Sequence, residues 1–213
     1  AGTQPIIGCQ LDLLYDHQNQ NLKPRPIVLL AKNKIGYKNL MKLSTIGYLE
    51  YDESDPYIKF NDLELYGDGL ICLSGGPTGP LGQLLLQDKS ESVAQLTDQF
   101  IKIFGDRFYL ELQRHPIQGE LKTVDETITE PKFLELAQKR NIPIVATNDI
   151  YFSNPEMYEA HDALLCISTG SYIDQQMPRR RITDQHYFKS TEEMKDLFSD
   201  LPEAILNTVE IAQ

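Results

Sequence analysis

The chain has 213 residues, of which 41% are hydrophobic and 24% are charged. This size and balance are typical of one globular domain, or of a domain with a small annex. No apolar run approaches the roughly 20 residues that a membrane span needs, and no signal peptide is recognisable. The formal net charge of −11 disfavours broad contact with nucleic-acid phosphates.

Five apolar segments are predicted to be strands, and predicted helices separate most of them. The strands are expected at Pro5–Tyr15, Ile27–Ala31, Gly69–Ser74, Phe108–Gln113 and Ile142–Ala146. The helices are expected at 33–50, 62–66, 81–87, 90–104, 131–140, 155–167, 191–198 and 202–212, with a polar linker at Tyr51–Asn61. This alternation predicts a β/α architecture with a largely parallel sheet.

The three cysteines, Cys9, Cys72 and Cys166, all lie in apolar settings, and no pair has C-x-x-C spacing. An odd number in such settings predicts buried free thiols rather than a disulfide framework or a cysteine zinc site.

Two of the predicted strands deliver polar side chains to their carboxyl ends, where β/α folds place their sites. His115 follows Phe108–Gln113, and Asp149 follows Ile142–Ala146. Asp149 is therefore where such a fold would hold a metal ion. A histidine two residues later would complete an Asp-x-His pair, but the chain has Tyr151 there.

Blocks of sequence along nearly the whole chain point to one family. They are Pro5–Cys9, Val28–Asn33, Gly36–Leu40, Gly69–Gly75, Phe108–Gln113, Pro143–Asp149, Glu159–Ile167, Tyr187–Ser190 and Asn207–Thr208. In this order they resemble the PHP (polymerase and histidinol phosphatase) domain of the alpha subunit of bacterial DNA polymerase III.

The resemblance implies a distorted seven-stranded β/α barrel, PHP-type and TIM-like, with a metal centre at the carboxyl ends of its strands. Residues 1–190 would be the PHP domain, and residues 191–213 would be closing helices at the junction to the polymerase core. The family's first strand, with its His-x-His motif, would lie upstream of Ala1, so the barrel here would be incomplete. The polymerase palm, with its Mg²⁺ ions, would lie downstream of Gln213.

The parent chain implied by the resemblance is a DNA-directed DNA polymerase, a nucleotidyltransferase of DNA replication in the bacterial cytoplasm. It would bind DNA and dNTPs and would have no membrane contact.

Several positions where the family carries metal ligands are substituted here. The family's Glu after Ile-Gly-Cys is Gln10, its Ser-Gly-Cys thiol position is Gly76, and the His of its Asp-x-His pair is Tyr151. Only His115 and Asp149 remain as good donors, and a zinc site normally needs three or four protein ligands. We therefore predict a vestigial centre, with no metal and no catalytic residue in this chain.

The retained residues also have ordinary structural interpretations, which we favour. His115 would be hydrogen-bonded at a strand end, and Asp149 would pair with a base or cap backbone N–H groups. His161 and Asp162 are expected to pack a helix rather than form a catalytic dyad, because adjacent helical residues point in different directions.

Two further segments are candidate contact sites. The loop Gly75–Gly79 lacks the Lys-Ser/Thr ending of a phosphate-binding loop, which favours a tight turn. Arg179, Arg180 and Arg181 form the basic cluster of an acidic chain. They predict a solvated loop, or else a contact loop for nucleic acid or an acidic partner.

The substituted site predicts a scaffolding role: bracing the polymerase core and docking other polymerase III holoenzyme subunits, above all a proofreading exonuclease. The alternative is a working phosphoesterase or 3′→5′ exonuclease that uses Zn²⁺ or Mn²⁺ in the PHP site. A free-standing β/α-barrel enzyme is a third and weaker interpretation.

Overall fold

The structure, a computed structural model, describes residues 2, 4–15, 23–51, 56–117, 120, 122–175 and 182–213. It is an α/β fold built on a six-stranded mixed sheet with the order β3-β1-β2-β4-β5-β6. The strands are β1 (Gly8–Leu14), β2 (Arg25–Ala31), β3 (Tyr57–Lys59), β4 (Leu70–Leu73), β5 (Phe108–Gln113) and β6 (Ile144–Thr147). The helices are α1 (Lys34–Ile46), α2 (Phe60–Tyr66), α3 (Pro80–Leu86), α4 (Ser90–Phe104), α5 (Val124–Arg140), α6 (Tyr158–Thr169), α7 (Thr191–Leu197) and α8 (Pro202–Ala212).

The sheet is less parallel than the sequence predicted, because β2 runs antiparallel to both β1 and β4. Residues 15–24 alone separate β1 from β2, and a parallel crossover needs about a dozen residues or more, usually with a helix. The pairs β1–β3, β4–β5 and β5–β6 are parallel. The carboxyl ends of all strands except β2 therefore meet at one edge of the sheet.

All five predicted strands are present, β5 with the predicted bounds and the other four with shifted ends, which confirms the α/β class. The predicted linker Tyr51–Asn61 was wrong in part, since it contains β3, which pairs with β1. β3 is a three-residue strand whose only fully buried side chain is Ile58. Such a segment is too short to show a period of two in the sequence. The seventh strand and the closed barrel stay predictions, as does the boundary at residue 190.

Helix α5 begins at Val124, seven residues before the predicted start at Pro131. Thr123 is its N-cap and forms a capping box with Glu126, a signal that the sequence analysis missed. Pro131 lies inside the helix and costs it one backbone hydrogen bond. The buried side chain of Phe133, 1% exposed, holds this part of the helix on the core.

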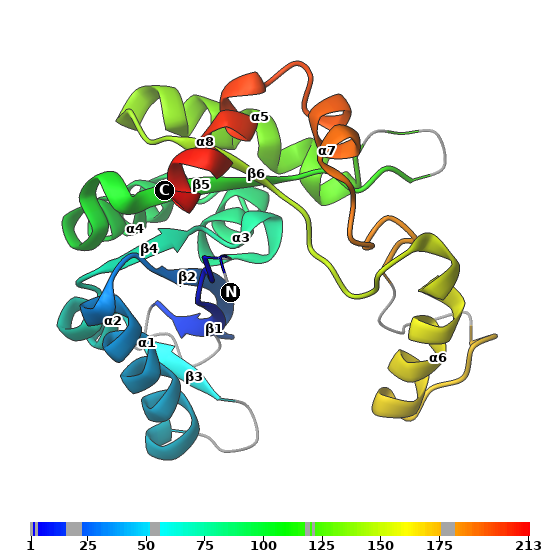
Figure 1. The fold of residues 1–213 in the computed structure, drawn as a ribbon, viewed down its shortest axis with the longest axis horizontal. Coiled ribbons are helices and arrows are strands. Elements are labelled where there is room, and N and C mark those ends of the chain that lie inside the picture. The colour runs from blue at the N-terminus through cyan, green and yellow to red at the C-terminus, as the bar shows by residue number, and fades with distance from the viewer. Residues whose placement is uncertain are drawn as a thin grey trace.

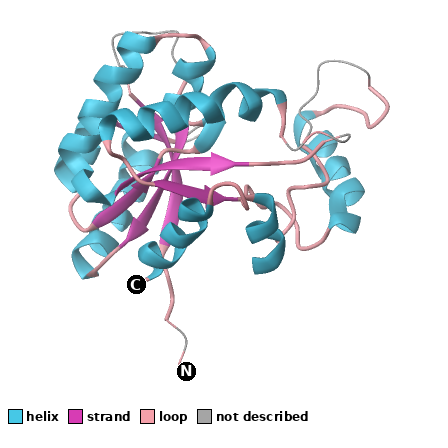
Figure 2. Ribbon diagram, turned by 90° about the horizontal axis from the view of Figure 1, so that it is seen from above, coloured by secondary structure: helices cyan, strands magenta, loops and turns pink. Residues whose placement is uncertain are grey.

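The main core lies between the sheet and the helices that cover one of its faces (Figure 2). Alternate residues of the strands point into it, and the ring of Phe108 in β5 stacks on Phe100 of α4 at 4.8 Å. The opposite face carries a smaller cluster of Ile71, Leu73 and Val145.

The described residues between β6 and α7, 148–175 and 182–190, form an excursion that we call the α6 arm. Figure 1 shows α6 set apart from the sheet at the end of the segment that leaves β6. The two ends of the arm are joined at its base. Phe152 forms a bridge with Tyr187, and the backbone N–H of Tyr151 donates to the carbonyl of His186 at 2.9 Å.

Cys9, Cys72 and Cys166 are free thiols, as predicted, although Cys9 is only half-buried. In the part of the chain that the structure describes, no helix combines the length and apolar character needed to cross a membrane.

A buried arginine connects β5 to the last two helices. The side chain of Arg114, 3% exposed, pairs with Glu130 of α5 at 2.8 Å and with Asp200 at 2.6 Å. It also lies over the ring of Phe198 at 4.6 Å. Because removing one partner of a buried ion pair leaves the other charge uncompensated, this network holds α7 and α8 on the sheet.

We expect Arg114→Ala to lower the free energy of unfolding by about 3 kcal/mol, measured by urea denaturation. The matched control is Lys102→Ala, which removes an exposed pair with Glu64 and is expected to cost less than about 1 kcal/mol. Equal effects of the two substitutions would contradict a stabilising role for the Arg114 network.

Candidate functional site

The candidate site lies at the carboxyl ends of β5 and β6. These strands pair in parallel with Gln113 opposite Thr147, so the residues that follow them emerge at the same edge. His115 and Asp149 both line a cavity of about 920 Å³ there. Tyr151 lines it as well, so three of the five predicted ligand positions come together.

The other two positions contribute no donor to this cavity. Gln10 lines a different pocket, with Tyr48 and Tyr57. Gly76 lies beside the cavity residues Pro77 and Thr78, has a φ of +56°, and faces the side chain of Gln113. A Cβ at position 76 would lie 2.8 Å from Oε1 of Gln113. Gln113 therefore fills the space that a thiol at this position would need.

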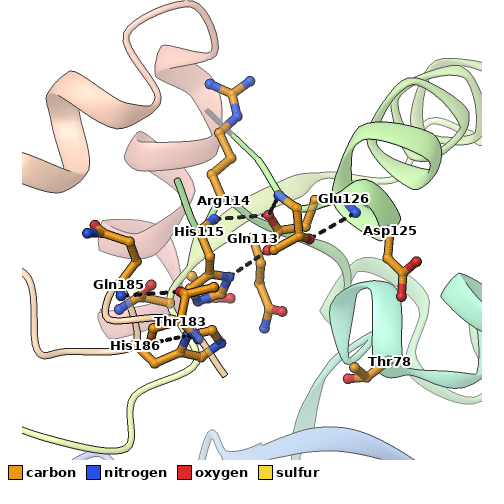
Figure 3. Close-up of polar contacts among 12 residues, drawn as sticks. Thr78, Gln113, Arg114, His115, Asp125, Glu126, Thr183, Gln185 and His186 are labelled. Atoms are coloured by element: carbon orange, nitrogen blue, oxygen red, sulfur yellow. Dashed lines mark hydrogen bonds and ion pairs between the residues drawn. The ribbon is translucent and has the colours of Figure 1, made fainter. Parts of the chain in front are cut away.

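His115 is held by a carboxylate from the first turn of α5 (Figure 3). Its Nδ1 lies 2.5 Å from Oε1 of Glu126, and its backbone N–H donates to Oε2 at 3.0 Å. Both side chains are 3% exposed. Burial opposes ionisation of Glu126, but its hydrogen bonds with His115 and the charge of that ring lower its pKa below the ordinary value.

The tautomer of His115 follows from this contact. An ionised carboxylate can only accept a hydrogen bond, so Nδ1 carries a proton. Nε2 is buried and has no hydrogen-bond partner among the described residues. The prediction of a hydrogen-bonded histidine at a strand end is thus met at Nδ1, whereas Nε2 is closed off from solvent.

A second histidine, which the sequence analysis did not consider for the site, covers the first. The ring of His186 stacks on His115 with centroids 3.9 Å apart and planes 7° apart. Burial, followed by the charge of His115, lowers the pKa of His186 to about 4. The backbone N–H of Thr183 donates to its Nδ1 at 3.2 Å. His186 is therefore a neutral, flat wall at neutral pH.

The rings of the α6 arm continue this wall. Tyr151 lies 5.3 Å from His161 and 5.8 Å from His186, measured between ring centroids. His161 also contacts Phe152, at 5.6 Å. Asp162 is buried on the same helix. These contacts agree with the packing role that the sequence predicted for His161 and Asp162.

A buried carboxylate that the sequence analysis missed lies on β5. Glu111, 4% exposed, accepts from the backbone N–H of Gly75 at 2.9 Å and from Oγ1 of Thr147 at 2.5 Å. Burial raises its pKa, and the charge of Asp149 adds to the rise. Glu111 ties the loop Gly75–Gly79 to β6, which supports the tight-turn interpretation of that loop. A charged residue within an otherwise apolar strand was the available signal.

The residues that line the cavity carry an uneven charge. Four are carboxylates, Asp125, Glu126, Asp149 and Asp184, and none of the described lining residues is lysine or arginine. The predicted contact loop of Arg179, Arg180 and Arg181 lies outside the residues that the structure describes.

The donors do not fit the several-metal centre of a hydrolytic site. Within the described residues, no three His, Cys, Asp or Glu side chains are arranged to hold a metal ion together. Nε2 of His115 is a suitable single donor, but the positions of Gln10, Gly76 and Tyr151 supply neither a carboxylate nor a thiolate nor an imidazole. We therefore derive no step through a metal.

The chain is a β/α protein with a mixed sheet. Its polar cavity lies at the carboxyl ends of parallel strands, where β/α folds place their active sites. Comparison with known proteins gives the family. The model of the PHP domain matches residues 1–115, and the chain belongs to that family.

The whole chain also aligns with one segment of several much longer proteins. It is 42% identical over 217 residues to a DNA polymerase III subunit alpha from Caulobacter vibrioides, covering 100% of this chain and 18% of that protein. The subunit from Rickettsia bellii is 41% identical over 214 residues (100% and 17%). That from Borreliella burgdorferi is 38% identical over 219 residues (100% and 19%). The chain thus spans less than a fifth of each relative.

The lowered pKa of His186 makes stability depend on pH. In the unfolded chain the ring has its ordinary pKa of 6.5, so between pH 6.5 and about 4 the unfolded chain binds a proton that the folded chain does not. The free energy of unfolding therefore falls as the pH falls through this window. We expect His186→Phe, which keeps a flat ring but cannot titrate, to flatten this dependence in urea denaturation.

His161→Phe is the matched control, because His161 lies outside the His115–His186 stack. An unchanged pH slope in His186→Phe would show that the ring titrates normally in the folded chain.

Proposed function

We propose that this chain is the PHP region of the alpha subunit of a bacterial replicative DNA polymerase, acting in the cytoplasm as part of the polymerase III holoenzyme. The parent chain would copy DNA from dNTPs in a palm that binds Mg²⁺. A seventh strand from the same polypeptide would complete a PHP-type barrel. The support is the full-length similarity to proteins named DNA polymerase III subunit alpha.

We further propose that this region is catalytically inactive and needs no Zn²⁺ or Mn²⁺. The observation that carries this proposal is the distribution of donors. Gln10 lines a separate pocket, and the side chain of Gln113 takes the space at Gly76. A phenol, with a pKa near 10, stands at Tyr151 and is a weak ligand near neutral pH.

Without its own chemistry, the region would brace the polymerase core and dock a proofreading exonuclease subunit. The α6 arm supports a docking role, because Leu164 and Ile167 of α6 are 62% and 78% exposed. Exposed apolar side chains gathered on one helix mark protein contacts. The net charge of −11 disfavours DNA as the molecule that covers this surface.

The rival proposal is a metal-dependent phosphoesterase or 3′→5′ exonuclease. One observation favours it: Nε2 of His115 is buried and has no hydrogen-bond partner in the described part of the chain, and both His115 and Asp149 line the cavity. Ligands supplied from elsewhere in the polypeptide would be needed to hold the metal.

Metal content and nuclease activity separate the two proposals. We expect the full-length protein, purified without added metal, to carry far less than one zinc or manganese per chain by elemental analysis. Any nuclease signal should be insensitive to chelator and unchanged in His115→Ala and Asp149→Ala. Near-stoichiometric metal, with exonuclease activity lost in both variants, would establish the rival.

Docking is tested by pull-down with the exonuclease subunit of the same organism at micromolar concentrations. We expect Ile167→Asp to weaken capture at least about tenfold, because it places a charge at the centre of an apolar contact. Leu65→Asp is the matched control, since Leu65 is 71% exposed on the distant helix α2. No capture by the unaltered chain would refute docking.

A further inference from the structure

A second basic cluster, which the sequence analysis missed, lies on helix α1. Lys34, Lys38 and Lys42 follow one another at four-residue intervals, so they lie on one face of the helix, roughly 6 Å apart along its axis. All three residues are exposed. No aspartate or glutamate occurs between Arg25 and Leu49, in a chain with a formal net charge of −11. We call Lys34, Lys38 and Lys42 the lysine stripe.

The lysine stripe is unfavourable for the helix that carries it. Like charges four residues apart on a helix repel each other, and the stripe contains two such pairs. Lys34 is also the first residue of α1, where the helix dipole disfavours a cation. None of the three lysines forms an ion pair with a described residue. The stability of α1 therefore does not account for the stripe, whereas a polyanion bound along it would relieve the repulsion.

A membrane surface is a poor match for this polyanion, because the apolar face of α1 is already in use. A helix that lies on a membrane places its apolar face among the lipids. In α1 the apolar residues Leu40, Leu43 and Ile46 are buried within the protein. The face that α1 offers to a partner is therefore the one that carries the lysine stripe.

The type of basic residue favours DNA over an acidic protein. Protein interfaces are enriched in arginine and depleted in lysine, and the stripe consists of lysine alone. Lysine binds phosphate as a point charge and is common among contacts with the DNA backbone. Tyr37, on the same exposed side of the helix, is 45% exposed, and tyrosine hydroxyl groups also donate to DNA phosphates.

The surroundings of α1 suit a duplex rather than a single strand. Figure 1 shows α1 at the outer edge of the fold, set apart from α6. Single-stranded DNA is held in grooves where bases stack on free aromatic faces. Tyr51, at the end of the turn that follows α1, instead stacks on Tyr57 at 5.1 Å and is covered by the Nζ of Lys59 at 4.0 Å.

We propose that the lysine stripe binds the phosphate backbone of duplex DNA. The inference rests on the proposed function, in which the parent chain holds primed DNA, and it adds a contact outside the palm. Because the contact is made with phosphates, it has no sequence preference. The stripe and the α6 arm lie at separate places in the fold (Figure 1), so DNA and a docked exonuclease would occupy different surfaces.

The test measures binding of a labelled primed duplex to the full-length protein by fluorescence anisotropy, over a range of NaCl concentrations. Each phosphate that a lysine neutralises adds about 0.9 to the steepness of the plot of log K against log salt concentration. We expect the triple variant Lys34→Gln, Lys38→Gln, Lys42→Gln to reduce this steepness by about 2–3.

The matched control is the triple variant Lys89→Gln, Lys139→Gln, Lys195→Gln, which changes three exposed lysines outside α1. It alters the net charge equally and is expected to leave the salt dependence unchanged. A photocrosslinking amino acid at position 38 should label the duplex, and one at position 195 should not. Circular dichroism checks that all variants stay folded.

An unchanged salt dependence in the stripe variant, or an equal reduction in the control, would overturn the inference. A reduction seen with single-stranded DNA alone would overturn the duplex as the bound molecule. Polyglutamate is the second probe: its binding lost in the stripe variant, with DNA binding unchanged, would assign the stripe to an acidic protein instead.

Primer extension by the unaltered full-length protein tests the proposed function separately. Extension together with an unchanged salt dependence in the stripe variant would refute the DNA contact alone. No extension would refute the polymerase, whatever the salt dependence shows.

Discussion

The end of β5 depends on two buried contacts with helix α5. Successive residues, Arg114 and His115, each take a carboxylate from that helix, Glu130 and Glu126. These two glutamates are four residues apart, so they lie on the same face of α5 one turn from each other. The two contacts therefore hold one face of α5 against the end of β5 at two points.

The two contacts have different consequences for the molecule. Arg114 also pairs with Asp200 and so connects the sheet to α7 and α8. The ring of His115 is oriented by Glu126 and supports the stack with His186, which holds the base of the α6 arm. Stability and the candidate site are thus built from adjacent residues. A change in α5 would affect both the closing helices and the cavity.

The sequence predicted the helices and strands that depend on a local pattern, and the residues that parallel strands bring to one edge of the sheet. The meeting of His115 and Asp149 followed from the shared edge of β5 and β6, and α4 and α8 have the predicted bounds. The role of Glu126 at the start of α5 could have been predicted, because Thr123 and Glu126 have capping-box spacing. The place of His186 beside His115 could not be predicted, since it depends on how the α6 arm returns to the sheet. No local signal encodes that return.

The charge of the cavity does not depend on the substituted positions alone. Gln10, Gly76 and Tyr151 stand where the PHP resemblance implies metal ligands, but Asp125 and Asp149 line the cavity with carboxylates. The charge of Asp149 adds to the effect of burial and disfavours ionisation of the buried Glu111. The hydrogen bonds that Glu111 accepts from Gly75 and Thr147 oppose this effect, so the contacts that tie the Gly75–Gly79 loop to β6 also stabilise a charge inside the sheet.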